Sequence, residues 1–232
     1  VQHFCHFAAI YDIAASLEVQ QIANIDGTRN AVNLAGTLNA GCFQHVSSIA
    51  AGGLYKGTFR EDMFEEAENY EHPYFSTKHD SEGIVRNECQ VPFRIYRPAM
   101  VVGNSVTGEI DKIDGAYYFF KSLQKIRNVL PPWFPLVGLE GGKFNIVPVD
   151  YVVDAMDHIA HLPNRDGDCF HLSDPEHHSM GQMMNIFATA GHAPRFSMRL
   201  DTRIFSFIPN IVRDTLANLP PVKRIVRTLL ED

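Results

Sequence analysis

The sequence lacks the features that mark several large classes of protein. Its four cysteines stand far apart without a C-x-x-C pair, which argues against a disulfide framework or a cysteine zinc site and indicates free thiols. No apolar run approaches the ~18 residues of a membrane-spanning helix, and no signal peptide is visible. Lys and Arg number 20 against 27 Asp and Glu, so nucleic acid is not an expected partner. We therefore expect a cytoplasmic protein.

The composition is typical of a globular domain. The chain has 232 residues, 45% of them hydrophobic and 20% charged, enough for one domain with a large core and a small lobe. Eleven histidines occur, but neither the pair His177-His178 nor His158 with His161 has a nearby set of carboxylates or cysteines. No metal site is predicted.

Short apolar runs alternate with helical periodicity in the first half of the chain. Strands are predicted over residues 1–9, 42–48 and 93–96. Helices are predicted over 14–39, as one helix or two joined near Gly27, and from His72-Pro73 to residue 89. This order of strands and helices predicts parallel βαβ units in an α/β, Rossmann-like, doubly wound sheet.

Beyond Gly103 the pattern loosens. It predicts helices over 117–129, 152–162 and 180–190, strands over 144–149 and 169–172, and a loop over 131–142. We assign 1–103 to the carboxyl-side part of a dinucleotide-binding domain, and 104–232 to a smaller, mostly helical substrate-binding lobe mixed with late sheet elements. Residues 195–230 favour a helix pair capping the substrate cleft; the alternative is a surface for acyl chains or a membrane interface.

Three residues carry the predicted chemistry: Ser48, Tyr74 and Lys78. Tyr and Lys four apart lie on one helix face, where the ammonium favours the phenolate and lowers the phenol pKa from about 10. Ser48 ends an apolar run and can hold a substrate oxygen beside that phenol, with Ser47 as the alternative serine. The pattern predicts proton transfer at a carbonyl or carbinol.

Five motifs, in order, resemble those of the extended short-chain dehydrogenases/reductases. They are His6-Phe-Ala-Ala9, Asn24-Ile-Asp-Gly-Thr28, Val46-Ser-Ser48, Arg97-Pro-Ala-Met-Val-Val-Gly103 and Val147-Pro-Val-Asp150. The resemblance implies that Ser48, Tyr74 and Lys78 are catalytic, and that Asn24 bends its helix and holds a water of the proton relay. It implies cofactor contacts from Ala8, Ala9, Ser47, Tyr74, Lys78, Pro98, Ala99, Met100 and Val101. For Arg97, a place beside the cofactor and a pairing with an acidic residue both stay open.

The whole chain is also similar to the amino-terminal reductase domain of two-domain bacterial alcohol-forming fatty acyl-CoA reductases. Segments that carry this similarity are Ser47-Ser-Ile-Ala-Ala51, Pro92-Phe-Arg-Ile-Tyr-Arg-Pro98, Asp157-His-Ile-Ala-His161 and Gly191-His-Ala-Pro-Arg195. The similarity implies reduction of a fatty aldehyde or fatty acyl-CoA towards the alcohol. It implies NADPH as cofactor, with NAD as the alternative, and a second reductase domain in the parent chain.

One element of these families is not found. A dinucleotide-binding domain begins with a strand, a G-x-x-G-x-x-G-type turn and a helix that hold the pyrophosphate, and no such turn occurs here. We expect about two βαβ units, at ~30 residues each, to be missing before Val1. We also expect the 232-residue chain alone to bind NADPH weakly.

Two other functions stay open. A nucleotide-sugar epimerase or dehydratase uses the same triad, but the aromatic stretch over 117–137 suits a lipid chain better than a diphosphate sugar. A non-catalytic dinucleotide-binding sensor is the other alternative, and the intact triad argues against it.

Overall fold

The chain divides into two compact units in the computed structural model. Unit 1 comprises Val1–Glu109 and Ile146–Asp174, and unit 2 comprises Ile110–Asn145 and Pro175–Asp232. The structure describes residues 1–11, 15–69, 72–111, 117–140, 142–176 and 178–201. The predicted helix pair or lipid surface over 195–230 therefore lies mostly outside the described residues.

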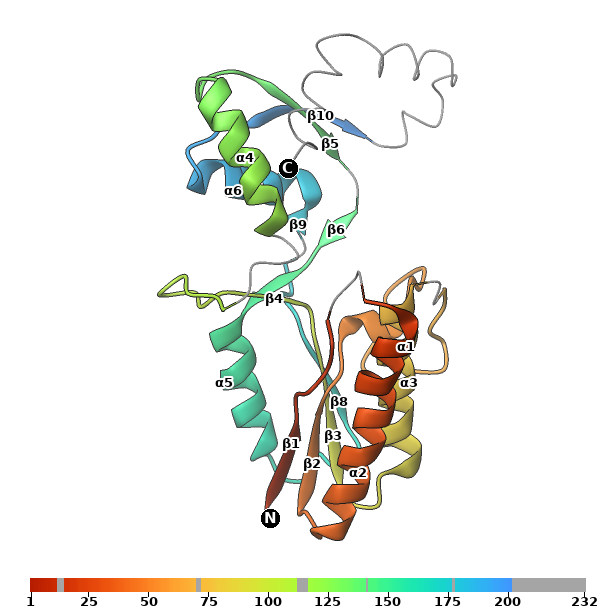
Figure 1. Cartoon of the computed structure of the whole chain (residues 1–232). Coiled ribbons are helices and arrows are strands. Elements are labelled where there is room, and N and C mark those ends of the chain that lie inside the picture. Colours follow the sequence, from red (N-terminus) through yellow and green to blue (C-terminus); the bar gives the residue numbers. More distant parts are fainter. Residues whose placement is uncertain (12–14, 70–71, 112–116, 141, 177, 202–232) are drawn as a thin grey trace. The chain divides into compact units, whose positions relative to one another are not determined.

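Unit 1 is built on a parallel sheet of four strands in the order β1-β2-β3-β8, shown in Figure 1. The strands are β1 (His3–His6), β2 (Cys42–Val46), β3 (Phe93–Pro98) and β8 (Cys169–Leu172). Their register pairs His6 with His45, Val46 with Tyr96, and Pro98 with Leu172. The carboxyl ends of the strands therefore share one edge, which is where open α/β sheets bind ligands.

Helices cover both faces of this sheet, as Figure 1 shows. One face carries α1 (Leu17–Gln20), a π-helical segment (Gln21–Asp26), α2 (Gly27–Thr37) and α3 (Pro73–Glu88). The other face carries α5 (Val149–Ala160). A buried cluster with Phe43 and Ile95 at its centre packs against α2 and α3, and a second with Tyr96 packs against α5. The predicted α/β, doubly wound, Rossmann-like fold is confirmed.

Local sequence signals explain where the helices begin. His72 caps α3 by accepting a hydrogen bond from the Tyr74 N–H at 3.1 Å, and Pro73 occupies the first turn, where no N–H partner is needed. Ser179 forms a capping box with Gln182 at the start of α6 (Met180–Ala190). The helix predicted over 14–39 is one continuous helical stretch over 17–37, which becomes π-helical at Gln21 and α-helical again at Gly27.

Some predicted bounds of strands and helices were wrong. The strand predicted over 1–9 is limited to His3–His6. The strand predicted over 144–149 is two pieces, β6 (Lys143–Phe144) and β7 (Ile146–Pro148), and α5 begins at Val149, three residues earlier than predicted. The strand β4 (Met100–Val102) was not predicted; it pairs in parallel with β7.

Unit 2 contains α4 (Tyr118–Val129), α6 and two pairs of strands. β5 (Leu136–Glu140) runs parallel to β10 (Phe196–Asp201), and β6 is antiparallel to β9 (His178–Ser179). The loop predicted over 131–142 was therefore wrong at 136–140, and the segment 195–230, predicted as a helix pair, begins with the strand β10 in its described part. Gly138 suggested a loop, but a Cβ there would lie 2.8 Å from the Phe196 side chain, so glycine permits the close packing of β5 on β10.

Candidate active site

Ser48 lies two residues after the end of β2, at the carboxyl edge of the sheet. Its backbone is extended, and its hydroxyl oxygen accepts a hydrogen bond from the Ala50 N–H at 3.1 Å, which caps a short 3₁₀ turn, Ile49–Gly52. The residue is half-buried. The 3₁₀ turn thus fixes the hydroxyl that the sequence predicted to hold a substrate oxygen.

Tyr74 and Lys78 lie one turn apart at the start of α3. The Ser48 side chain is near enough to the Tyr74 hydroxyl to lower its pKa, and the Tyr11 ring packs edge-on against the Tyr74 ring with centroids 4.9 Å apart. Lys78 Nζ donates to the Val46 carbonyl at 3.1 Å, two residues before Ser48. The structure therefore brings together all three residues of the predicted triad.

The pKa values of this pair depart from the prediction. Burial raises the pKa of Tyr74 to about 12, against a lowering contribution from the Ser48 side chain. Burial lowers the pKa of Lys78 to about 8, while the negative charge of Glu82 acts in the other direction. The expectation that Lys78 lowers the phenol pKa was wrong for the protein without substrate, because removing the phenolate from water outweighs other influences.

Asn24 lies in the π-helical segment and is buried, with 1% of its surface exposed. Its side chain accepts from the Ile10 N–H at 2.7 Å and donates to the Ile10 carbonyl and to Thr77 Oγ1, both at 3.2 Å. Asn24 therefore links the segment after β1 to α3 within the turn that joins Tyr74 and Lys78. Its predicted hold on a relay water stays a prediction.

The predicted cofactor residues fall mostly at the same edge of the sheet. Ala8 and Ala9 follow β1 and are exposed. Pro98 ends β3 and is buried, and the Ala99 N–H donates to the Leu172 carbonyl at 2.9 Å. Met100 and Val101 continue into β4. The contacts of these residues with a cofactor stay a prediction.

Ser47 is the exception among them, because its hydroxyl is buried elsewhere. It donates to Glu82 at 2.7 Å, and Glu82 also pairs with Arg97, whose side chain is fully buried. Arg97 thus pairs with an acidic residue, one of its two predicted roles. Glu82 was not predicted as a site residue, although its spacing of four from Lys78 places it on the same helix face as Tyr74 and Lys78.

The residues present fit one part of a dinucleotide. Ser48, Tyr74 and Lys78 supply two hydroxyls and an ammonium, donors that suit a ribose and a substrate carbonyl. Among the described strand–helix junctions, no glycine-rich turn offers a pyrophosphate site. Gly53 has φ +63°, and a Cβ there would lie 2.0 Å from the Glu68 carbonyl oxygen, so this glycine serves the packing of its own loop.

Other sites are scarce in the part of the chain that the structure describes. An open hollow of about 650 Å³ belongs to unit 2 and contains none of the predicted catalytic residues. It is lined by His178, Gln182, Asn185, Ile186, Thr189, Ala190 and Arg195. Among the described residues, no three His, Cys, Asp or Glu side chains are grouped to hold a metal ion. No described helix is long and apolar enough to cross a membrane.

A doubly wound parallel sheet with Ser, Tyr and Lys gathered at the carboxyl ends of its strands defines the extended short-chain dehydrogenases/reductases, which bind NAD(P). Within that class, this chain belongs to the NAD-binding family described as Male sterility protein, which matches residues 1–156.

Two curated relatives illustrate the sequence similarity. The non-canonical nonribosomal peptide synthetase hkm10 of Aspergillus hancockii is 28% identical over 197 residues, covering 80% of this chain and 19% of the relative. The aldehyde reductase lnbA of Aspergillus flavus is 28% identical over 181 residues, covering 73% of this chain and 17% of the relative. The chain thus spans less than a fifth of the length of these relatives.

Two solved structures share the fold. The terminal R domain from the myxalamid PKS-NRPS biosynthetic pathway matches with TM-score 0.68 and 22% identity, covering 97% of this chain and 55% of that one. The UDP-glucuronic acid 4-epimerase from Bacillus cereus in complex with NAD matches with TM-score 0.65 and 17% identity, covering 87% of this chain and 63% of that one.

Proposed function

We propose that this chain is the catalytic part of an NADPH-dependent reductase that converts a long-chain aldehyde to the alcohol. The observation that carries the proposal is the meeting of Ser48, Tyr74 and Lys78 at the carboxyl ends of the strands: Ser48 acts on the pKa of Tyr74, and Lys78, one turn along the same helix, donates to the Val46 carbonyl beside Ser48. NADPH supplies the hydride when bound; the chain's own residues manage the proton and the oxygen.

Tyr74 is the proton donor in this proposal. With its pKa raised to about 12, the phenol is protonated at neutral pH and has a proton to give as the carbonyl oxygen gains negative charge. Ser48 donates a second hydrogen bond to that oxygen and stabilises the developing charge. Lys78, as the ammonium, binds the ribose and offsets charge on Tyr74 after proton transfer.

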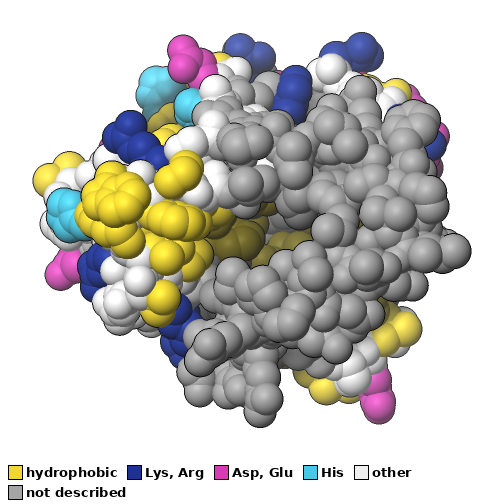
Figure 2. Space-filling model, turned by 90° about the horizontal axis from the view of Figure 1, so that it is seen from above, with side chains coloured by type: hydrophobic (Ala, Val, Ile, Leu, Met, Phe, Trp, Pro, Cys, Tyr) yellow, Lys and Arg dark blue, Asp and Glu magenta, His cyan; other side chains and the backbone are white. Residues whose placement is uncertain are grey.

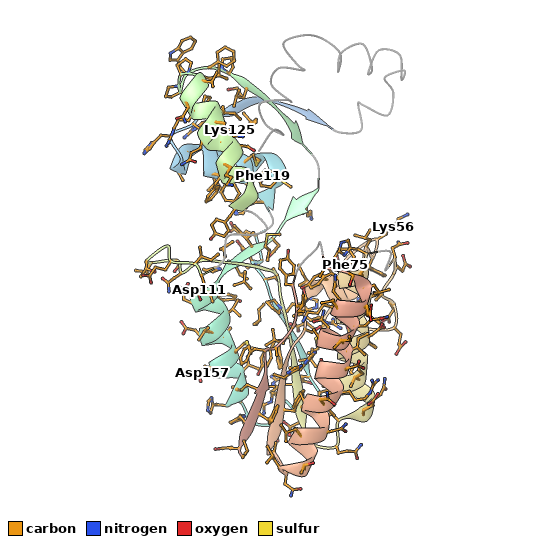
Figure 3. The ribbon with its side chains drawn as sticks, viewed as in Figure 1. Lys56, Phe75, Asp111, Phe119, Lys125 and Asp157 are labelled. Atoms are coloured by element: carbon orange, nitrogen blue, oxygen red, sulfur yellow. The ribbon has the colours of Figure 1, made fainter. Side chains whose placement is uncertain are left out.

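An apolar substrate is supported by the exposed aromatic residues of unit 2. Trp133 is 79% exposed, and Phe119, Phe120 and Phe134 are between 36% and 41% exposed. Figure 3 shows Phe119 and Lys125 on α4, and Figure 2 shows hydrophobic side chains gathered on one face of the molecule. The relative named aldehyde reductase supports carbonyl reduction as the reaction.

A second candidate substrate is an acyl thioester, either acyl-CoA or an acyl group on a carrier protein. The relative named as a nonribosomal peptide synthetase and the similar R domain of a PKS-NRPS pathway favour it. With a thioester, Ser48 and Tyr74 would stabilise and protonate the carbonyl oxygen in the same way, and the hemithioacetal so formed would then break its C–S bond, releasing the thiol and leaving the aldehyde.

A substrate panel separates the candidates. NADPH consumption by the natural full-length protein is followed with decanal, decanoyl-CoA and a UDP-sugar, with NADH in parallel. We expect turnover with decanal and a preference for NADPH. Turnover with decanoyl-CoA alone would replace the aldehyde by the thioester, and conversion of the UDP-sugar alone, without net NADPH loss, would overturn the reductase proposal.

A further inference from the structure

A buried carboxylate lies one helical turn beyond Lys78 on α3. Glu82 has 0% of its surface exposed, and both of its oxygens are fully engaged. It accepts hydrogen bonds from Ser47 Oγ at 2.7 Å, Arg97 Nε at 3.0 Å, Arg97 Nη2 at 2.6 Å, Arg86 Nε at 3.0 Å and Arg86 Nη2 at 2.8 Å.

The charge of Glu82 is maintained by these partners. Burial alone would raise the pKa of this carboxyl, but the hydrogen bonds from Arg97 and Ser47 and the charges of Arg97 and Arg86 outweigh it and lower the pKa. A buried ion pair of this kind is seldom a large source of stability, because both groups lose their hydration. The segments that Glu82 connects are therefore more informative about its role than its contribution to stability.

Glu82 joins the segments that carry the triad. Ser47 precedes Ser48 at the end of β2, and Glu82 shares a helix face with Tyr74 and Lys78 at intervals of four residues. Arg97 brings in the end of β3. It also donates to the Met63 carbonyl at 2.9 Å, in the connection that runs from Ser48 to Tyr74. One carboxylate thus links the serine strand, the tyrosine helix and the segment between them.

We propose that Glu82 is a positioning residue, which fixes the Ser48 hydroxyl relative to the Tyr74–Lys78 face of α3. The kinetic part of this inference rests on the proposed reductase function. A misplacement of about 1 Å between groups that share a substrate oxygen costs on the order of 100-fold in rate. The buried hydrogen bonds of Glu82 beside the triad therefore affect turnover directly.

Glu82 has a second effect, on the charge of Lys78. Among the groups that face this ammonium, His6 from β1 and His45 from β2 have their pKa values lowered by burial and by Lys78 itself, so both are neutral at neutral pH. Glu82 is the negative charge that favours the ammonium. Removing that charge should make Lys78 lose its proton at a lower pH.

The first test removes the hydrogen bond between Ser47 and Glu82 without changing any charge. Ser47→Ala in the natural full-length protein removes the hydrogen bond to Glu82 and leaves both guanidiniums paired. We expect kcat for aldehyde reduction to fall at least 10-fold, KM for NADPH to stay within about threefold, and the melting temperature to stay near wild type. Arg29→Gln, which breaks an exposed ion pair with Glu88, is the matched control and should leave kcat unchanged.

The second test needs no substrate. Glu82→Gln keeps the shape and an acceptor oxygen but removes the charge. The Lys78 amine is titrated by NMR in lysine-labelled protein, with Lys78→Arg for assignment, and its pKa should fall by about one pH unit from the wild-type value. An unchanged titration, or a Ser47→Ala kcat within twofold of wild type, would overturn the inference. If wild type reduces no aldehyde, the reductase proposal fails while the titration still decides the role of Glu82.

Discussion

The two units bury their interiors in different ways. Unit 1 has two core clusters, one on each face of its sheet, and its Phe43, Ile95 and Tyr96 side chains have no exposed surface. Unit 2 has one small described cluster, whose fully buried members are Leu123, Ala188 and Ala193. Its aromatic residues are largely at the surface, with Trp133 as the extreme case.

We propose that the two units have separate physical tasks, catalysis in unit 1 and substrate binding in unit 2. A catalytic triad needs side chains held within a fraction of an ångström, which a densely packed sheet with buried polar ties provides. Binding of varied apolar chains needs exposed hydrophobic surface, which a well-packed interior does not offer. The predictions below test whether chemistry and substrate binding divide in this way.

The largest expected effect is at the triad itself. Tyr74→Phe removes the transferable proton and leaves the ring in contact with Tyr11, so aldehyde reduction should fall by about 10²- to 10⁴-fold while the Kd for NADPH changes only a few-fold. Steady-state loss of NADPH absorbance measures it. A variant that kept more than about a tenth of the wild-type rate would show that Tyr74 is not the acid.

Shortening a buried side chain in each core should lower the unfolding free energy of the two units by different amounts. Phe43→Ala removes a fully buried ring at the centre of the unit 1 cluster and should cost about 3–5 kcal/mol of unfolding free energy. Leu123→Ala in the smaller cluster of unit 2 should cost about 2 kcal/mol, since its alanine neighbours leave less packing to lose. Amide hydrogen exchange, resolved by segment, measures the unfolding free energy of each unit. If either variant lowered the unfolding free energy of both units equally, the two cores would not be independent of one another.

The pH dependence should follow Lys78. Its pKa of about 8 means that the ammonium is present below pH 8 and is lost as the pH rises through that value, so kcat/KM for reduction should decline on the alkaline side. Lys78→Arg, which stays charged, should lower the overall rate but remove that decline. A wild-type profile that is flat from pH 7 to 10 would show that the ammonium is not required.

The smallest expected effect is on the surface of unit 2. Trp133→Ser changes a side chain that is 79% exposed, so the unfolding free energy should stay within about 0.5 kcal/mol of wild type. KM for a long-chain aldehyde should rise several-fold, while KM for a short-chain aldehyde should not change. Equal changes for both chain lengths would remove Trp133 from the proposed substrate surface.

The triad could be predicted because each part of it depends on local rules. Helical spacing places Tyr74 above Lys78, and parallel pairing brings the end of β2 beside them. The role of Glu82 could not be predicted in the same way, because its partner Arg97 lies on another element and an acidic helix residue is ordinarily solvated. The β5–β10 pair was missed for a related reason: residues about sixty positions apart pair there, and no local pattern records this.

The π-helical segment makes the chain unusually sensitive to its length at one place. A π turn contains one residue more than an α turn, and here that extra residue accompanies the buried position of Asn24. Deleting a single residue between Gln21 and Asp26 would let the stretch relax to a regular α-helix with little rotation of the flanking turns, because the π turn already holds the extra residue within one turn, and the bulge that carries Asn24 would be lost. The fold would keep its sheet and lose the link that Asn24 makes between Ile10 and Thr77. A change of one residue in length here would therefore affect the catalytic end of α3 and leave the sheet intact.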